Sequence, residues 1–456
     1  MGQRDRYPVA IIGAGLAGLT AATFLRRQGV PAILYEAGPK VAGLATSFHD
    51  EDGFTYDFGA HFITNRLAAA LGVGAQCRTV ASYGERVWLK GRSYAYPLGL
   101  LSVFRFLRDG VARRLVPKRV DSPSGSAAEW FRANYGTAFA DEVAIPLVEA
   151  WSGAPAARLA ASVGEKLGNS VWKVIHLKLA SWRSRRAVAC GYSQEMPESP
   201  EVWHVYPEGG LGFLCQRLAA GLDDAIRLDS PVDEILVDSG RVRAVRVKGR
   251  EQPVSAVVST APCHILAKLV RGSEALRPLA RFRYRPMAFV NMRFAGRGIL
   301  PDTVLWIPDR HAPFFRLTET PLSMPWLAPE GKTLLTADIG CEVGDEQWRM
   351  SDEMLGARCV DHLDLLFPRI RERYLGCRVL RTPIAYPVYL QEYEIDRRRF
   401  EQSSGVDGLY SIGRNGQFAH ALMEDVYWRT LKTMRDLVAS LAAPDEGPGR
   451  QLRRAG

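Results

Sequence analysis

A glycine-rich turn near the N-terminus constrains the fold of this 456-residue chain more than any other feature. The apolar run 9–12 leads into Gly13-Ala14-Gly15-Leu16-Ala17-Gly18, and an Ala/Leu-rich segment typical of a helix follows. In a strand–turn–helix unit, the first glycine permits the tight turn, the second lets a pyrophosphate approach the backbone, and the third lets helix and strand pack closely. Glu36 follows the next apolar run at the spacing of an acceptor for a ribose hydroxyl. An ordinary glycine-rich turn explains the glycines but not Glu36, so the pattern predicts a dinucleotide site at the helix N-terminus.

The composition fits a globular chain with room for two or three domains, because 47% of its residues are hydrophobic. No apolar run reaches the roughly 18–20 residues that a membrane-spanning helix needs. The first six residues are polar and charged, unlike a secretory signal. The seven cysteines form no Cys-x-x-Cys pair, which argues against structural zinc and a disulfide framework. We therefore expect a cytoplasmic protein without a metal site.

The net charge of +10 comes mainly from arginine, in local clusters such as 183–186 and 397–399. No aromatic-interleaved basic stripe or nucleic-acid module accompanies them, so we expect no nucleic-acid partner. A solvated basic surface explains the clusters. Attraction of an anionic substrate or an acidic membrane surface is the alternative, and the amphipathic basic segment 98–118 motivates the membrane version.

Periodicity predicts α/β elements at both ends of the chain around a mixed middle. Helices are expected at 103–115, 127–150, 214–222 and 424–441, and strands at 241–247, 256–260, 287–294, 333–339 and 408–413. The segments 121–126 and 191–200 are expected to be surface linkers. This order indicates a nucleotide domain built from non-contiguous segments, with a substrate domain inserted into it.

Three further segments resemble flavoproteins of the amine oxidase and protoporphyrinogen oxidase group. They are Tyr206-Pro-Glu-Gly-Gly-Leu-Gly-Phe213, Ser230-Pro-Val-Asp-Glu-Ile235 and Val257-Val-Ser-Thr-Ala-Pro262. The resemblance implies FAD, which we expect to be non-covalent, and an α/β fold with a Rossmann-like (glutathione-reductase-type) FAD-binding domain and an inserted α+β substrate domain. The expected domains are 1–65, 205–275 and 405–442 for FAD and 66–204 and 276–404 for the substrate, with a disordered tail at 443–456.

Other segments are similar to UDP-galactopyranose mutase. They are Tyr56-Asp-Phe-Gly-Ala-His-Phe-Ile-Thr-Asn65, Phe314-Phe-Arg-Leu-Thr-Glu319 and the stretch 412–424, which resembles the C-terminal flavin motif. This chain departs from the mutase pattern at three positions. His420 stands where the mutases carry a tyrosine that touches the diphosphate, Leu422 replaces an acid, and Ala42 replaces one of two glycines at the second flavin contact. These departures leave FAD binding in place but weaken the transfer of the mutase substrate.

The resemblances imply a set of site residues. The implied catalytic residues are His61, Arg316, Tyr386 and His420. The implied FAD-binding residues are Gly13, Ala14, Gly15, Leu16, Ala17, Gly18, Glu36, Ala37, Gly43, Leu44, Gly59, Ala60, His61, Val232, Gly413, Arg414, Leu422 and Met423. Each has an ordinary structural explanation beside the functional one. Arg316 either pairs with Glu319 or binds an anionic substrate group, and His61 either faces the flavin or is a packed core histidine.

Two functions remain open from the sequence. We favour an FAD-dependent oxidoreductase in which an organic small-molecule substrate gives hydride to flavin N5. The alternative is a flavin-dependent nucleotide-sugar pyranose/furanose mutase, an isomerase whose substrate is a nucleotide sugar. The sequence does not predict the oligomeric state.

Overall fold

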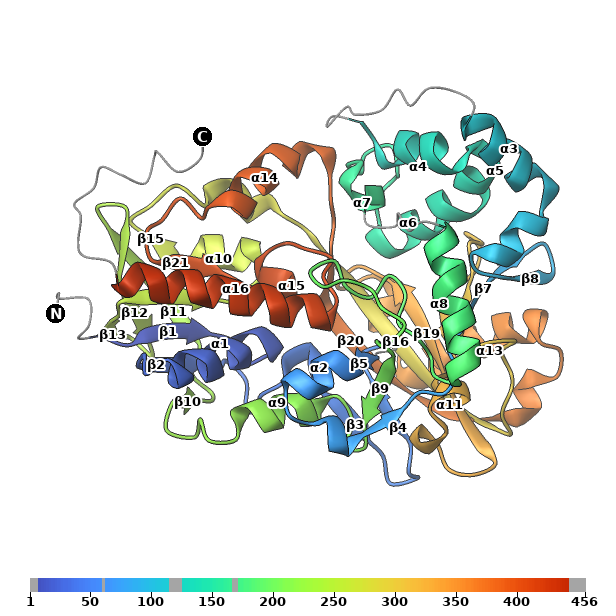
Figure 1. Cartoon of the computed structure of the whole chain (residues 1–456), viewed down its shortest axis with the longest axis horizontal. Helices are drawn as coiled ribbons and strands as arrows, with labels where there is room; N and C mark the ends of the chain where they lie inside the picture. The colour runs from blue at the N-terminus through green and yellow to red at the C-terminus, as the bar shows by residue number, and fades with distance from the viewer. Residues whose placement is uncertain (1–6, 60–61, 115–124, 166–170, 443–456) are drawn as a thin grey trace.

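The computed structural model describes residues 7–59, 62–114, 125–165 and 171–442 (Figure 1). Ala60, His61, most of the linker expected at 121–126 and the tail expected at 443–456 lie outside these ranges.

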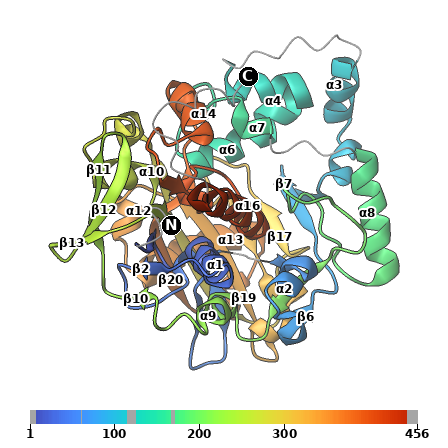
Figure 2. The same ribbon diagram turned by 60° about the vertical axis from the view of Figure 1, so that its left-hand side comes forward.

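A five-stranded parallel sheet forms the nucleotide-binding half of the molecule. Its strand order is β10 (Ile226–Arg227), β2 (Ala32–Tyr35), β1 (Val9–Ile12), β14 (Ala256–Ser259), β21 (Leu409–Ser411). Helices α1 (Leu16–Arg27) and α16 (Met423–Ala442) pack side by side on this sheet, as Figure 2 shows. The sheet therefore takes its strands from three well-separated parts of the chain.

Both faces of this sheet are buried, which explains why β1 is apolar at every position. Val9 and Ile11 pack in the cluster that contains α1 and α16, whereas Ala10 and Ile12 pack in a second cluster. That second cluster includes residues of β11, β12 and β15 from a four-stranded sheet, whose order is β13 (Arg250–Pro253), β12 (Arg241–Val247), β11 (Val232–Asp238), β15 (Val270–Arg271).

A seven-stranded mixed sheet forms the other half. Its order is β20 (Tyr374–Pro387), β16 (Tyr284–Ala295), β19 (Lys332–Gly340), β18 (Arg316–Thr318), β17 (Val304–Trp306), β7 (Glu85–Leu89), β8 (Arg92–Ala95). Alternate residues of β16 face opposite sides. Val290 and Met292 pack in the cluster of α13 (Asp352–Leu366), whereas Met287 and Phe289 pack on the other face. Phe289 lines a large cavity there, so this sheet is one wall of the candidate site.

Short helices complete the molecule beside the seven-stranded sheet. They are η4 (Leu98–Ser102), α3 (Phe104–Arg114), α4 (Ala127–Tyr135), α5 (Thr137–Phe139), α6 (Ile145–Ser152), α7 (Ser162–Glu165) and α8 (Val171–Ser184). The single helix expected at 127–150 is therefore wrong. Gly136, at φ +86°, ends α4, and a π-helical turn at 140–144 precedes α6, although the apolar spacing continues across both.

The remaining elements connect these parts. They are β3 (Ser47–His49) with β4 (Thr55–Asp57), the sheet β5 (Ile63–Thr64), β9 (His204–Pro207), β6 (Cys77–Thr79), and helices α2 (Asn65–Ala70), α9 (Gly212–Ala219), α10 (Cys263–Leu269), α11 (Thr320–Ser323), α12 (Glu346–Arg349), α14 (Glu394–Gln402) and α15 (Gly413–Gly416). The expected strand 241–247 coincides with β12, and the expected helix 424–441 differs from α16 by one residue at each end. The division into an FAD-binding and a substrate domain stays a prediction.

Candidate functional site

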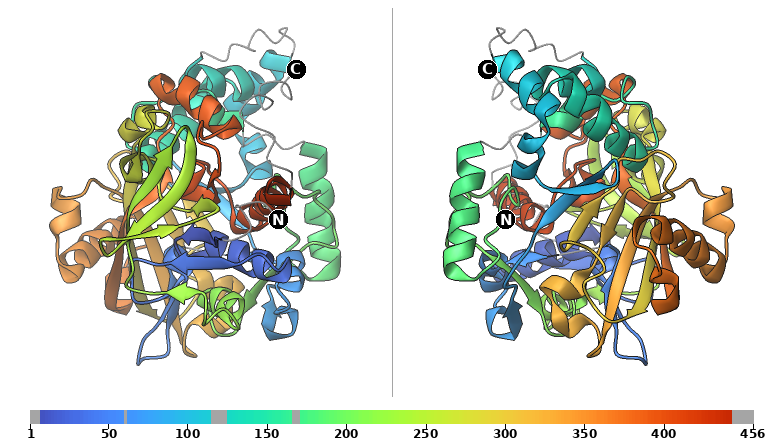
Figure 3. Two further views of the ribbon diagram at one scale, coloured as in Figure 1. Left: turned by 90° about the vertical axis from the view of Figure 1, so that its left-hand side faces the viewer. Right: turned by 90° about the vertical axis from the view of Figure 1, so that its right-hand side faces the viewer.

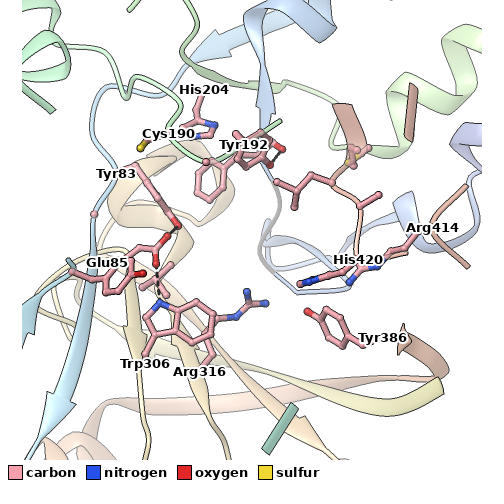
Figure 4. A pocket seen from close by; sticks show the side chains of 18 of the residues that line it. Tyr83, Glu85, Cys190, Tyr192, His204, Trp306, Arg316, Tyr386, Arg414 and His420 are labelled. Atoms are coloured by element: carbon pink, nitrogen blue, oxygen red, sulfur yellow. Dashed lines mark hydrogen bonds between the residues drawn. The ribbon is translucent and has the colours of Figure 1, made fainter. Parts of the chain in front are cut away.

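A cavity of about 2020 Å³ lies between the two large sheets and continues toward α3 and α8 (Figure 4). Residues just beyond four of the parallel strands line one end of it. Gly13, Glu36 and Thr260 directly follow β1, β2 and β14, and Gly413 lies two residues after β21. The carboxyl ends of parallel strands are where α/β folds bind ligands. The volume exceeds the roughly 300–1,000 Å³ of an ordinary small-molecule pocket, so it has room for a dinucleotide and a substrate together.

The glycines of the N-terminal turn have distinct surroundings. A Cβ on Gly13, which lies at φ +95°, would stand 2.1 Å from the Thr260 hydroxyl oxygen, and one on Gly18 would stand 1.9 Å from the Gly13 carbonyl oxygen. These two glycines are required by close packing. Gly15 lines the cavity and precedes α1 without a side-chain cap, so the first amides of this helix are available to an anion.

Glu36 also lines this end of the cavity. Its carboxylate accepts hydrogen bonds from the amides of Ala14 (2.7 Å) and Gly38 (2.8 Å). These bonds fix the carboxylate and leave each oxygen a further lone pair, as an acceptor for a ribose hydroxyl requires.

Arg414 of α15 also lines the cavity, with its guanidinium carbon 4.5 Å from the centre of the Tyr386 ring. Its Nε and Nη2 atoms are buried and have no hydrogen-bond acceptor among the described residues. A buried guanidinium without an anion is unfavourable, and a phosphate or ribityl oxygen would satisfy it. The helix N-terminus, Glu36 and Arg414 together fit a flavin dinucleotide.

Arg316 forms a buried ion pair in the middle of the cavity wall, and its partner is Asp338. The side chain of Arg316 is 17% exposed and that of Asp338 is completely buried. Burial alone would lower the pKa of Arg316, but the neighbouring carboxylate more than offsets this effect, so the pKa is raised. The guanidinium also lies 5.5 Å from the centre of the Trp306 ring.

Of the two alternatives for Arg316, the pairing with Glu319 is wrong, because the carboxylate partner is Asp338. Glu319 instead accepts hydrogen bonds from the amides of Gly298 (2.9 Å) and Leu300 (2.7 Å) and from the Thr333 hydroxyl (2.9 Å). Residues three apart on an extended chain point to opposite faces. Asp338 faces Arg316 because it lies directly opposite in the register of β18 with β19.

Tyr386 and His420, predicted from separate segments, line the cavity together (Figure 4), and Trp151 of α6 packs against both rings. The His420 ring centre is 4.9 Å from that of Trp151 and 5.5 Å from that of Tyr386. The His420 amide donates to the Tyr389 hydroxyl at 2.7 Å. These contacts form a packed aromatic wall beside Arg414.

The structure separates the predicted FAD-binding residues into two groups. Those that line the cavity are Gly13, Gly15, Leu16, Ala17, Glu36, Gly43, Leu44, Gly413, Arg414, Leu422 and Met423. Those that are described but do not line it are Ala14, Gly18, Ala37, Gly59 and Val232. Ala60 and His61 lie outside the described residues, so their placement stays a prediction.

A polar cluster that the sequence motifs do not reveal lies beside Arg316, because its member Trp306 pairs with Arg316 in the register of β17 with β18. Glu85 accepts hydrogen bonds from the Tyr83 hydroxyl (2.5 Å) and the Trp306 indole N–H (2.8 Å), as the dashed lines of Figure 4 mark. Burial and the adjacent carboxylate raise the pKa of Tyr83 well above its usual value. His204 also lines the cavity, and burial lowers its pKa to about 4, so this ring is neutral at pH 7.

The part of the cavity farthest from the glycine-rich turn is mainly apolar. Side chains of η4, α3, α5 and α8 surround it, namely Leu100, Leu101, Phe106, Leu107, Val111, Phe139, Val174, Leu177 and Trp182. Within the described ranges, no group of three or more His, Cys, Asp or Glu side chains is placed to hold a metal ion.

Comparison with known proteins agrees with this architecture. Residues 16–427 match the model of the flavin-containing amine oxidoreductases, and the chain belongs to this family. It is 21% identical over 363 residues to coproporphyrinogen III oxidase of Staphylococcus aureus, a match that covers 73% of this chain and 78% of that one. The expected FAD cofactor and the oxidoreductase class are thereby confirmed.

Solved structures show the same fold. A reduced UDP-galactopyranose mutase superposes with a TM-score of 0.75 at 20% identity over 96% of this chain and 97% of that one. A putative protoporphyrinogen oxidase from Exiguobacterium sp. gives a TM-score of 0.73 at 18% identity over 95% and 99%. The predicted α/β fold with a Rossmann-like FAD-binding part is confirmed.

Proposed function

We propose that this FAD-dependent oxidoreductase oxidises a bulky, mostly apolar organic molecule, which gives hydride to the flavin. The observation that carries the proposal is the apolar chamber of η4, α3 and α8, because it is continuous with the dinucleotide end of the cavity. FAD, when bound, supplies the hydride acceptor. The name of the Staphylococcus aureus relative supports a large ring compound as the substrate class.

The side chains of this protein would bind and orient. Arg414 and the α1 N-terminus would hold the anionic part of the dinucleotide. Tyr386 and His420, with Trp151 packed against their rings, would hold the substrate in place beside the dinucleotide and exclude water. The apolar chamber would bind the remainder of the substrate by removing its apolar surface from water.

A nucleotide-sugar mutase is the second candidate, supported by the fold of UDP-galactopyranose mutase and by Arg316 in the cavity wall. Two observations count against it. The charge of Arg316 is already neutralised by Asp338, and His420 stands where the mutase pattern has a tyrosine. A sugar diphosphate would therefore have to compete with a fully buried carboxylate for this guanidinium.

An anaerobic half-reaction tests the proposal. The purified holoenzyme is mixed with porphyrinogens, amines and other candidate reductants, and loss of the visible absorbance of oxidised flavin is recorded. In parallel, the dithionite-reduced protein is incubated with UDP-, GDP- and TDP-hexoses, and furanose products are sought by chromatography. Bleaching by an apolar substrate supports the oxidoreductase, whereas furanose formation without bleaching contradicts it.

A matched pair of variants tests the chamber itself. Leu177→Trp fills part of it, since Leu177 lines the cavity and is buried, whereas His176→Trp places the same ring on the exposed side of α8. We expect Leu177→Trp to raise KM about tenfold or more at unchanged flavin content, because it removes volume that the substrate needs. An equal KM in both variants would contradict binding in this chamber.

A further inference from the structure

Large apolar side chains are exposed to solvent around the place where the cavity reaches α3 and α8. Phe104 is 75% exposed and Trp182 is 79% exposed, values that are unusual for rings of this size. Further exposed apolar residues there are Leu107 and Val111 on α3, Leu179 on α8 and Leu101 on the preceding η4. Four of this group, Leu101, Leu107, Val111 and Trp182, also line the cavity. We call these six residues the mouth patch.

The mouth patch is continuous with the interior of the protein, which distinguishes it from scattered surface leucines. Figure 3 shows α8 at the outer edge of the molecule, and Figure 1 shows α3 and α8 on the same side, away from the parallel sheet. The inner side of α8 contributes Val174 and Leu177 to the cavity, while Leu179 and Trp182 face solvent. Apolar side chains thus line the cavity from the chamber to the outside, with the polar side chains of Lys178, Ser181 and Arg185 among them.

Basic side chains accompany the patch. Lys178 of α8 and the adjoining Arg183, Arg185 and Arg186 are all exposed. Arg183 and Arg185 form no ion pair with any described residue. The face around the mouth therefore combines apolar rings with uncompensated positive charge.

We propose that the mouth patch docks on an anionic lipid bilayer, with Phe104 and Trp182 inserted at the level of the headgroups. Exposed aromatic and aliphatic side chains flanked by arginine and lysine are the chemistry of interfacial membrane binding. A second copy of the chain fits less well, because a symmetric contact would bring the same arginines together. No helix in the described part of the chain has the length and apolarity to cross a bilayer, so this contact lies at the surface.

Docking in this orientation would open the cavity onto the lipid rather than onto water. A consequence, which rests on the proposed function, is that the substrate would be taken from the bilayer and would therefore belong to the class of lipid-dissolved molecules. Docking does not depend on the reaction, so an experiment can distinguish a failure of docking from a failure of the proposed oxidation.

Vesicle sedimentation of the FAD-loaded full chain tests the docking. Phosphatidylcholine vesicles with and without phosphatidylglycerol are compared at low and high salt. We expect the protein to pellet with the anionic vesicles, and increasing salt to weaken this binding. Phe104→Ser with Trp182→Ser should lower the partition coefficient about tenfold or more, because both anchoring rings are lost. Arg183→Glu with Arg185→Glu should abolish the preference for anionic vesicles.

The control is a pair of equally exposed apolar residues on other elements, Leu365→Ser on α13 with Ile395→Ser on α14, which are 77% and 84% exposed. Unchanged binding of this control supports the mouth patch as the docking surface. The proposal is overturned if wild-type protein does not pellet with anionic vesicles, or if the control loses binding as much as the Phe104/Trp182 variant. It is also overturned if sedimentation velocity shows a dimer that only the Phe104/Trp182 variant disrupts, because a second copy would then occupy the patch.

Discussion

Asp57 should make the stability of this protein depend on pH. Asp57 is buried at the end of β4, and its carboxyl accepts hydrogen bonds from the hydroxyls of Ser47 (2.5 Å) and Tyr206 (2.8 Å). Burial raises the pKa of Asp57 to about 7, and the two hydrogen bonds only partly oppose this effect. The folded protein therefore holds a proton on this carboxyl that an unfolded chain would have released.

The size and sign follow from linkage. An aspartate in the unfolded chain titrates near pH 3.9, so the folded state binds one proton more than the unfolded state between about pH 4 and pH 7. In that window the free energy of unfolding falls by about 1.4 kcal/mol per pH unit as the pH rises, and above about pH 7 the loss is complete. An asparagine side chain at this position would be neutral throughout, so Asp57→Asn should gain about 3 kcal/mol relative to the wild type between pH 5 and pH 8.

Thermal unfolding with excess FAD at each pH measures this difference. A chain of this length unfolds with an entropy of about 1 kcal/mol per kelvin, so the melting temperature of Asp57→Asn should rise by about 3 °C relative to wild type from pH 5 to pH 8. The control is Asp52→Asn on the same hairpin, which removes only the exposed ion pair with Arg293 and should follow the wild type. Parallel pH profiles for wild type and Asp57→Asn would refute a raised pKa at this carboxyl.

Four further substitutions have defined outcomes. Ala42, which takes the place of a glycine in the family pattern, lies at φ +94°. Ala42→Gly should therefore stabilise the fold by up to about 1 kcal/mol in denaturant unfolding, and an unchanged midpoint would show that the backbone at Ala42 is not strained. Gly15→Val should abolish flavin absorbance in the purified protein, because a side chain would fill the space in front of the α1 N-terminus; retained flavin would place the pyrophosphate elsewhere. Arg414→Ala should weaken FAD binding about tenfold or more in fluorescence titrations, and an unaltered affinity would mean that its buried N–H groups do not face the cofactor. Arg316→Met should destabilise the fold by about 3–5 kcal/mol, because Asp338 is left unpaired. Adding Asp338→Leu should restore most of the lost stability, and activity that survives in the double variant would limit Arg316 to a structural role.

The local elements of the fold were predictable because their signals are short-range. The strand–turn–helix unit of Gly13, Gly15 and Gly18 needs only neighbouring residues, and β12 was identified with its full bounds because alternating polarity marks a half-buried strand. Gly136 shows the limit of prediction from local patterns. Apolar spacing alone predicts one helix at 127–150, but the positive φ of Gly136 ends the first helix there.

The partners within the site depend on pairing between distant segments. Asp338 lies opposite Arg316 because of the register of β18 with β19, and no local sequence pattern predicts that register. The apolar chamber likewise combines α3 with α8, which are more than fifty residues apart in the chain. An isolated aspartate within the apolar run 333–339 was the one available signal, since a charge inside a buried strand requires a partner.

The strands of the parallel sheet come from distant parts of the chain, which has a consequence for synthesis on the ribosome. β1 and β2 are made within the first 35 residues, but the strand that pairs with the outer edge of β14 comes from residues 409–411. Until that segment emerges, Val257 and Val258 form an apolar strand edge with unsatisfied backbone groups, a template for pairing with other chains. Gly413 and Arg414 emerge only after β21, so the nascent chain lacks this side of the dinucleotide site until translation is nearly complete. Cofactor loading is thus a late step in maturation, and FAD supply and chaperone protection should limit the yield of active protein together.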